Sequence, residues 1–350
     1  CLKKIIMKNK VIFFSIDRLG DYLIRSNVIF KISKLYKLSD IAVSEKNFKL
    51  VNTQNIFNKV ILFNTSKKIL NKLKFILIFL FKKYDAAISF DGKNISNILL
   101  IVVRAKFKHV FIYKKKGVIK NIRFNLYCKF LNLLNISFTV MNSRELIELD
   151  KKEHYPTKYK LLKKYFNNID NKTYYLEKLT PFKNINLNED FILMHLDEKF
   201  DDIIDIKTNF SNSLNNLSNN LDKKIILTTF KNNFEYYKNL LIEKISYQDI
   251  KKHNLYNKKI CILEDVPLND FYYLIKNSSI NISCHGGFFV HASLLNNKNT
   301  IDIINNSDEK WLNTWITKSD TYKIVYKSNS KKKIYINEIL LKLNNTINEF

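Results

Sequence analysis

The sequence is poor in glycine and proline, with only five glycines and three prolines among its 350 residues. It contains no dinucleotide-binding loop of the G-x-G-x-x-G type. Lys, Asn and Ile, the amino acids of A/T-rich codons, are abundant instead, so compositional drift has worked against glycine. The adjacent Gly286-Gly287 is therefore expected to meet a backbone need, either a positive φ or the close approach of a ligand, rather than to form a plain tight turn.

Cysteines and long apolar runs are also few. The four cysteines form no C-x-x-C pair and no metal-ligand spacing, which is typical of a reduced cytoplasmic protein. The most apolar run, 75–81, is too short to span a bilayer and has lysines on both sides, so it is predicted to be a core-facing helix or one that lies on a membrane. A signal peptide is not expected, because the apolar run 11–16 is short and leads directly into a structured motif.

Acidic residues are scarce relative to basic ones. The 59 Lys and Arg against 32 Asp and Glu give a formal net charge of +27. This excess is spread along the chain, with no Arg-rich arm, zinc-finger spacing or RNP-like aromatic motif. Nucleic-acid binding, which would need the lysines to gather on one face, therefore ranks as an alternative function, and nucleic acid is not an expected partner. The charge favours anionic ligands and an anionic membrane surface.

Strands and helices alternate along the chain, which indicates parallel sheets covered by helices on both faces. The pattern weakens from about 142 to 188, where mixed helix and an interdomain connection are expected. Strands are predicted at 11–16, 40–43, 60–63, 86–90, 109–113, 191–195, 224–228, 259–263, 280–283 and 300–304. Helices are predicted at 22–36, 69–83, 96–104, 267–277 and 335–350, with another after Gly287.

The length of the chain predicts two domains, and its hydrophobic content of 46% is enough for packed cores. We expect an α/β protein with two Rossmann-like domains, 1–170 and 171–350, that face each other across a ligand cleft in the GT-B arrangement. The C-terminal helix could pack back on the N-terminal domain. The Asn-rich patch 212–220 is interpreted as compositional drift.

Two strand-to-helix turns hold the candidate functional residues. The second half of the chain is organised around Ser283-Cys284-His285-Gly286-Gly287, where backbone N–H groups converge and the dipole of the following helix favours an anion. Cys284, His285 and His291 could be imagined as metal ligands, but without a fourth ligand no metal is expected. In the first half, the turn Asp17-Arg18-Leu19-Gly20-Asp21 follows the first strand. By residue type alone, Asp21 would be an ordinary helix N-cap.

Three stretches resemble one family. Asp17-Arg18-Leu19-Gly20-Asp21, followed by an apolar helix, resembles the N-terminal signature of glycosyltransferase family 9, the heptosyltransferase-like enzymes. Residues 84–92 are similar to that family's second strand motif, and 268–291 look like its C-terminal nucleotide-sugar motif. The likeness extends over roughly residues 11 to 315, with the motifs in the family's order.

The resemblance implies an inverting, metal-independent glycosyltransferase that moves a sugar from a nucleotide-diphosphate donor to a lipopolysaccharide or surface-polysaccharide acceptor. The N-terminal domain would hold the glycan or lipid-linked acceptor, the C-terminal domain would hold the nucleotide sugar, and no cofactor is implied. The expected location is the cytoplasm, with peripheral contact at the inner face of a bacterial plasma membrane. A catalytically silent relative that binds nucleotide sugar or glycan without transferring it is the alternative.

The resemblance also implies roles for individual residues. Asp21 matches the family's catalytic base, and Asp17, Arg18 and Gly20 would shape the loop or touch the acceptor. The implied donor-binding residues are Lys199, Thr228, Glu235, His285, Gly286, Gly287 and His291. Alternatives are a solvated loop lysine for Lys199, a surface helix charge for Glu235 and a core histidine for His291. His285 stands near where the family carries an acid, which favours the silent relative, whereas retention of Asp21 opposes it.

Overall fold

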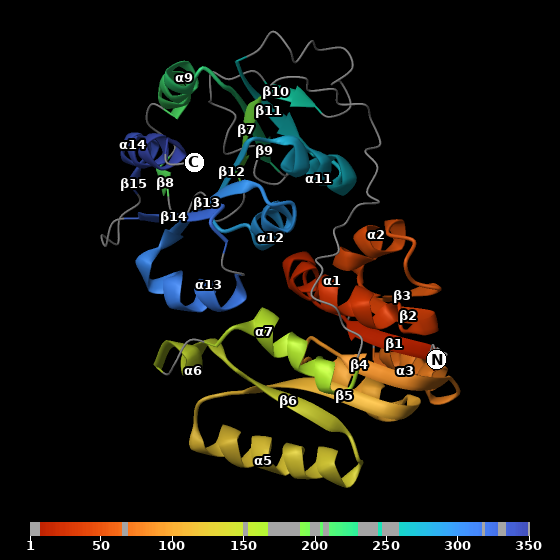
Figure 1. Cartoon of the computed structure of the whole chain (residues 1–350). Coiled ribbons are helices and arrows are strands. Elements are labelled where there is room, and N and C mark those ends of the chain that lie inside the picture. Colours follow the sequence, from red (N-terminus) through yellow and green to blue (C-terminus); the bar gives the residue numbers. More distant parts are fainter. Residues whose placement is uncertain are drawn as a thin grey trace, which may run out of the picture. The chain divides into compact units, whose positions relative to one another are not determined.

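The computed structural model describes residues 8–64, 69–149, 153–166, 190–196, 204–205, 210–229, 244–246, 259–316, 319–327 and 334–348. The chain divides into two compact units, of which unit 1 comprises residues 1–178 with 310–316, and unit 2 comprises 179–309 with 317–350. Each unit contains a parallel sheet with helices packed on it (Figure 1). Within the described residues, no helix has the length and hydrophobicity needed to cross a membrane.

The sheet of unit 1 has six strands in the order β3-β2-β1-β4-β5-β6, and all its pairings are parallel. This strand order reverses between β1 and β4, which is the switch point of a Rossmann-type sheet. The strands are β1 (Lys8–Ser15), β2 (Tyr36–Ser44), β3 (Lys59–Phe63), β4 (Lys83–Ser89), β5 (Arg104–Lys114) and β6 (Ser137–Asn142).

The helices of unit 1 include three that pack on one face of the sheet. α3, α4 and α5 share a single hydrophobic cluster with the strands, to which they contribute Phe79, Leu99 and Leu131. The helices are α1 (Leu19–Ser33), α2 (Glu45–Thr53), α3 (Ile69–Leu80), α4 (Asn94–Val102), α5 (Val118–Leu133), α6 (Arg144–Leu149), α7 (Tyr155–Tyr159), the 3-10 helix η1 (Lys160–Lys164) and α13 (Glu309–Trp315).

Helix α13 belongs to unit 1 although its neighbours in sequence belong to unit 2. Tyr155 of α7 stacks on Trp315 with the ring centroids 3.9 Å apart, and Trp311 meets the same tyrosine edge-on at 5.9 Å. Aromatic pairs of this kind are worth about 0.5–1.5 kcal/mol beyond the area that they bury. Both tryptophans of the chain therefore lie in unit 1, so their fluorescence follows the folding of that unit.

The main sheet of unit 2 has seven strands in the order β10-β11-β9-β7-β12-β13-β14, again all parallel. The strands are β7 (Phe191–Leu196), β9 (Lys224–Thr229), β10 (Lys244–Ser246), β11 (Ile260–Glu264), β12 (Ile280–Ser283), β13 (Asn299–Asn305) and β14 (Tyr322–Lys327), with a separate pair β8 (Ile204–Asp205) and β15 (Ile334–Tyr335). The helices are α9 (Phe210–Leu221), α11 (Leu268–Asn277), α12 (Gly287–Leu295), the 3-10 helix η5 (Asn306–Asp308) and α14 (Ile336–Ile347).

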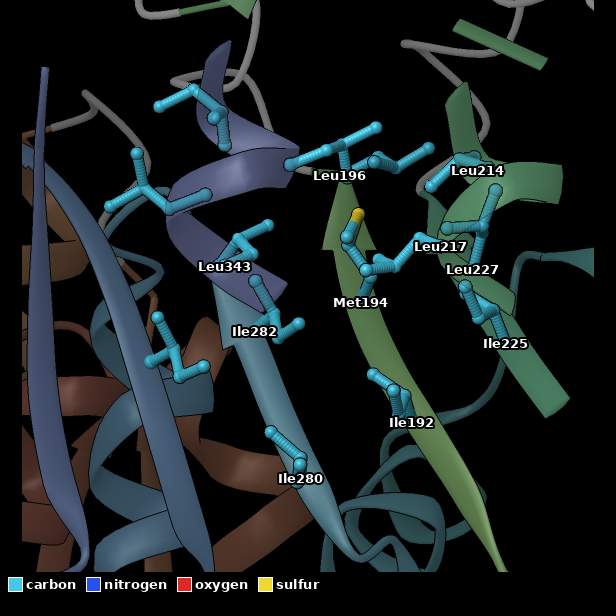
Figure 2. Packing of buried hydrophobic residues seen from close by; sticks show 14 of the residues in the cluster. Ile192, Met194, Leu196, Leu214, Leu217, Ile225, Leu227, Ile280, Ile282 and Leu343 are labelled. Carbon is cyan, nitrogen blue, oxygen red and sulfur yellow. The ribbon is translucent and has the colours of Figure 1, made fainter. Parts of the chain in front are cut away.

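Every second residue of the central strands enters the core of unit 2. Figure 2 shows Ile192 and Met194 of β7 in this cluster, together with Ile282 of β12 and Leu217 of α9. Side chains at alternate strand positions share one face, so a strand inside a covered parallel sheet reads as a nearly continuous apolar run. Burial of each such side chain contributes about 1.5–3 kcal/mol.

The Asn-rich patch 212–220 belongs to α9, in which Leu214 and Leu217 are buried in the core while Asn215 and Asn216 are exposed. One sequence-based expectation needs correction in unit 2. The C-terminal helix α14 packs against α9 and β14 of its own unit, so the segment that joins unit 1 is α13 instead.

The predicted alternation is otherwise confirmed, since every predicted strand overlaps an observed one. The elements that the sequence missed include α2, α5, α9 and α13 among the helices and β6, β10 and β14 among the strands. The first helix was placed too late: α1 begins at Leu19 rather than at residue 22, and it ends at Ser33, so that Tyr36 opens β2. That shift changes the structural position of Asp21.

Candidate functional site

The predicted residues of unit 1 lie where the parallel strands end, beside the switch point between β1 and β4. Strand β1 ends at Ser15 and leads through a loop of three residues into α1. In open parallel sheets, ligands bind outside the carboxyl ends of the strands at this point.

A buried ion pair anchors this loop. The Asp17 carboxylate pairs with the Arg25 guanidinium from the second turn of α1, and both side chains are buried. Arg25 also donates to the hydroxyls of Tyr159, at 3.2 Å, and Ser15, at 3.4 Å. Burial raises the pKa of the Asp17 carboxyl, and the Arg25 guanidinium opposes that rise. Asp17 therefore has the contacts of a residue that shapes the loop, and its carboxylate is not exposed to an acceptor.

The backbone of the same loop is held by the neighbouring strand ends. The Ser44 hydroxyl donates to the Asp17 carbonyl at 2.7 Å, and the Asn47 amide donates to it at 3.0 Å. The Asp91 carboxylate, after β4, accepts from the Ile16 N–H at 2.8 Å. The start of α1 is thus fixed from both sides.

The turn after β4 needs the glycine that follows Asp91. Gly92 has φ +63°, and a Cβ at this position would lie 2.5 Å from Cδ2 of the Tyr113 ring. Both the left-handed backbone and the ring therefore exclude a side chain. This turn lets Asp91 reach the loop after β1.

Asp21 is the third residue of α1 and is partly exposed. Its interpretation as an N-cap is wrong, because Arg18 occupies that position and makes no side-chain capping bond. Within the described part of the chain, the Asp21 carboxylate has no hydrogen-bond or ion-pair partner. The first turn of a helix stabilises a negative charge. An accessible carboxylate without such a partner can accept a proton from a hydroxyl. Arg18 is exposed and Gly20 partly exposed beside it.

In unit 2, the turn between β12 and α12 differs from its prediction. Gly286 is the N-cap of α12 with φ −73°, and Gly287 is the first helical residue. The positive φ falls on His285, at +55°, so the expectation that a glycine meets this need is wrong. A Cβ added to Gly287 would meet no atom within 4 Å. The chain itself therefore gives no steric reason for Gly287, which leaves a plain turn and the close approach of a ligand as its explanations.

Asp302 holds His285 at two points. One carboxylate oxygen accepts from the His285 backbone N–H at 2.8 Å, and the other lies 2.7 Å from Nδ1 of the ring. The Tyr322 hydroxyl donates to the second oxygen at 3.0 Å. Asp302 is fully buried on β13, directly opposite Ser283 of β12. This clamp offsets the cost of the left-handed backbone and fixes the orientation of the imidazole beside the start of α12.

His291 lies deeper than its prediction required. It is the fifth residue of α12 rather than a residue of the helix start, and it is buried. Burial, and secondarily the nearby His285, lowers the pKa of the His291 imidazole to about 3. The ring is therefore neutral at pH 7 and can donate at most one N–H.

Of the three other predicted donor residues, Thr228 is the one within the described part of the chain. The Thr228 hydroxyl is buried and lies 3.0 Å from Nδ1 of His195, whose ring packs between Phe271 and Phe289. Burial lowers the pKa of His195 to about 4, so this histidine is neutral. Lys199 and Glu235 lie outside the described residues. No group of three or more His, Cys, Asp or Glu side chains in the described ranges could hold a metal ion.

No known family profile matches the sequence. The protein Ycf2 of Physcomitrium patens is 24% identical over 345 residues, which are 90% of this chain but 14% of that protein. The chain thus spans only a small part of the length of this relative.

Solved structures give a broader match. E. coli heptosyltransferase WaaC with ADP-2-deoxy-2-fluoro heptose has a TM-score of 0.64 at 11% identity, covering 96% of this chain and 99% of that one. A glycosyl transferase of family 9 from Veillonella parvula has 0.61 at 10% identity, covering 97% of each chain. E. coli ADP-heptose lps heptosyltransferase II has 0.59 at 12% identity, covering 97% of this chain and 99% of that one. The chain has the heptosyltransferase fold.

The heptosyltransferase fold confirms the predicted fold class, two Rossmann-like α/β halves of the GT-B type. In this fold the turn between β1 and α1 and the turn between β12 and α12 have corresponding positions. Each lies at the carboxyl edge of a parallel sheet, and each opens a helix whose N-cap makes no side-chain capping bond. Unsatisfied backbone N–H groups at such helix starts attract negative charge.

Proposed function

We propose that this protein is a glycosyltransferase that moves a sugar from a nucleotide-diphosphate donor to a hydroxyl of a lipopolysaccharide or surface-polysaccharide acceptor. The observation that carries the proposal is the carboxylate of Asp21 at the start of α1, which has no hydrogen-bond or ion-pair partner among the described residues, in a chain with the heptosyltransferase fold. The E. coli relatives were solved with ADP and with ADP-2-deoxy-2-fluoro heptose, which supports a nucleotide sugar as the donor.

In the proposed reaction, the acceptor oxygen attacks the anomeric carbon of the donor from the side opposite the diphosphate. A new carbon–oxygen bond forms while the bond to the phosphate oxygen breaks, so the configuration inverts. Asp21 takes the proton of the acceptor hydroxyl, and the diphosphate leaves with the bonding electron pair. No metal or cofactor is required in this scheme, because protein groups balance the charge of the leaving group.

Unit 2 would supply those groups. The backbone N–H groups at the start of α12 and the positive end of its dipole stabilise a diphosphate. Because Nδ1 of His285 donates to the Asp302 carboxylate, Nε2 is the ring nitrogen left for a phosphate oxygen, and it would donate there only when both ring nitrogens carry a proton.

A donor panel tests the proposed function. The purified full chain is incubated with ADP-, UDP- and GDP-sugars and a lipopolysaccharide core acceptor in the presence of EDTA, and release of nucleoside diphosphate is measured. We expect release with one donor class only when acceptor is present. Binding of a nucleotide sugar without release, with or without added divalent metal, would instead identify the silent relative that the His285 position favours.

Gly287 provides a more local test. Gly287→Ala should leave the stability of the fold unchanged within about 0.5 kcal/mol, because the new methyl group meets no atom of the chain. The same methyl group would obstruct a diphosphate at the start of α12, so we expect donor affinity, measured by calorimetry, to fall at least tenfold, or ~1.4 kcal/mol.

The matched control is Asn94→Ala at the exposed first position of α4 in unit 1, which should leave donor affinity unchanged. If Gly287→Ala binds the donor as tightly as the original chain does, the phosphate site does not lie at this turn.

A further inference from the structure

Helix α5 of unit 1 has apolar side chains on the side that faces away from the sheet as well as on the side that packs against it. Leu131 is its only fully buried residue among those described, while Val118, Leu126 and Leu133 are 77%, 61% and 79% exposed. The outward apolar residues of α5 are Val118, Ile119, Ile122, Leu126, Phe130 and Leu133.

These six side chains fall on one side of the helix. At about 100° per residue they occupy an arc of roughly 120°. Arg123 and Lys129, both exposed, lie toward the two edges of that arc. The inner side, with Phe124 and Tyr127, packs on the hydrophobic cluster of the sheet. The outer arc is therefore not needed for the core of unit 1.

Two further helices on the same face of the sheet add exposed apolar residues. Helices α3 and α4 share the hydrophobic cluster with α5, and Leu77, Ile78 and Phe81 near the end of α3 are exposed, as is Ile98 of α4. Figure 1 shows α5 as the outermost element of unit 1 on this side of the sheet. We call the exposed apolar side chains of these three helices, Phe81 included, the α5 face.

The charge around the α5 face has one sign. None of α3, α4 and α5 contains an Asp or Glu, and no acidic residue occurs between Asp91 and Glu145. Lys115, Lys116 and Lys120 precede or begin α5 and are exposed. A second copy of the chain would bring two such basic faces together, and their like charges would repel. An anionic surface has the complementary charge.

We propose that the α5 face binds the surface of a bilayer that contains anionic lipid. Helices with an apolar arc edged by Lys and Arg lie in the plane of the membrane interface with their apolar side chains among the acyl chains. Each basic residue near such a surface strengthens binding about fivefold at moderate salt. The inference does not depend on the transfer reaction and would place unit 1 at the membrane by its helical face.

Vesicle cosedimentation of the full chain tests the proposal. We expect binding to vesicles of phosphatidylcholine with phosphatidylglycerol, weaker binding to phosphatidylcholine alone, and weakening by salt. Leu126→Ser with Leu133→Ser should reduce the partition coefficient at least tenfold, since both side chains would leave the acyl region. Lys115→Gln, Lys116→Gln and Lys120→Gln together should reduce it by a similar factor or more.

Matched controls separate this face from general surface properties. Leu161→Ser with Leu341→Ser removes two exposed leucines elsewhere, and Lys37→Gln, Lys46→Gln and Lys49→Gln remove the same charge from another part of unit 1. Both sets should bind nearly as the original chain does.

The proposal is overturned if the chain ignores anionic vesicles at low salt, or if the Leu126 and Leu133 variant binds as well as its control. It is also overturned if light scattering shows that the original chain is a dimer that does not bind vesicles and that the Leu126 and Leu133 variant is a monomer. Donor turnover with a water-soluble acceptor should be the same in all these variants, so a failure here is distinguishable from a failure of the proposed transfer function.

Discussion

Asp21→Asn is expected to lower the rate of sugar transfer by about 10²–10⁴-fold while leaving donor affinity nearly intact. The amide has the size of the carboxylate but cannot accept the acceptor's proton. In the proposed function the donor lies on unit 2, so a change in unit 1 should not disturb it. The measurement is the single-turnover rate of transfer alongside donor affinity from calorimetry.

The position of Asp21 makes this substitution a clean one. Because Asp21 is not the N-cap of α1, its replacement removes only a favourable charge in the first turn, worth about 0.3–1 kcal/mol of stability. Glu45→Gln is the matched control, since Glu45 is an exposed acid in the first turn of α2. Near-full transfer by Asp21→Asn would eliminate Asp21 as the base and with it the mechanism.

Arg25→Met is expected to lower the free energy of unfolding of unit 1 by about 3–5 kcal/mol, because it leaves the buried carboxylate of Asp17 without its cation. Trp311 and Trp315 both belong to unit 1, so tryptophan fluorescence during urea unfolding follows this unit alone. Transfer should also fall, since the same ion pair shapes the loop before Asp21.

A double variant distinguishes an unpaired charge from lost packing. Arg25→Met combined with Asp17→Asn removes both charges, and it should be more stable than Arg25→Met alone. If the two substitutions destabilise unit 1 additively, the ion pair does not explain the effect, and the contact of the Arg25 guanidinium with the Tyr159 ring does.

The fold was predictable because its signals are local. Parallel strands covered on both faces appear in the sequence as short apolar runs. The turns after β1 and β12 are indicated by their glycines, because glycine is rare in this chain. Asp21 could be singled out only through the resemblance of its turn to the signature of glycosyltransferase family 9, and its place in the helix could not be predicted. The start of α1 depends on Ser44 of β2, Asn47 of α2 and Asp91 after β4, which hold the preceding loop from other parts of the chain.

The parts of the site that the sequence missed depend on contacts between distant residues. Asp302 meets His285 only because β12 and β13 pair with Ser283 opposite Asp302. The available signal was a carboxylate inside the apolar strand Ile301-Asp302-Ile303, which must have a partner when buried. Arg25 gave a similar signal, as a cation on the inward side of α1 between Tyr22 and Ile29. The His285 φ had no such signal, since left-handed backbone is expected of glycine first.

The insertion of α13 in unit 1 has a consequence for synthesis on the ribosome. Residues 1–178 emerge first, but unit 1 lacks α13 until residue 316 has left the exit tunnel. That segment follows about 140 residues later, a delay of roughly 7–28 s at ~5–20 residues per second. During this interval Tyr155 has neither Trp311 nor Trp315 to pack against. The nascent N-terminal half therefore waits with an exposed aromatic surface, and a chain truncated before α13 should be a substrate for chaperones.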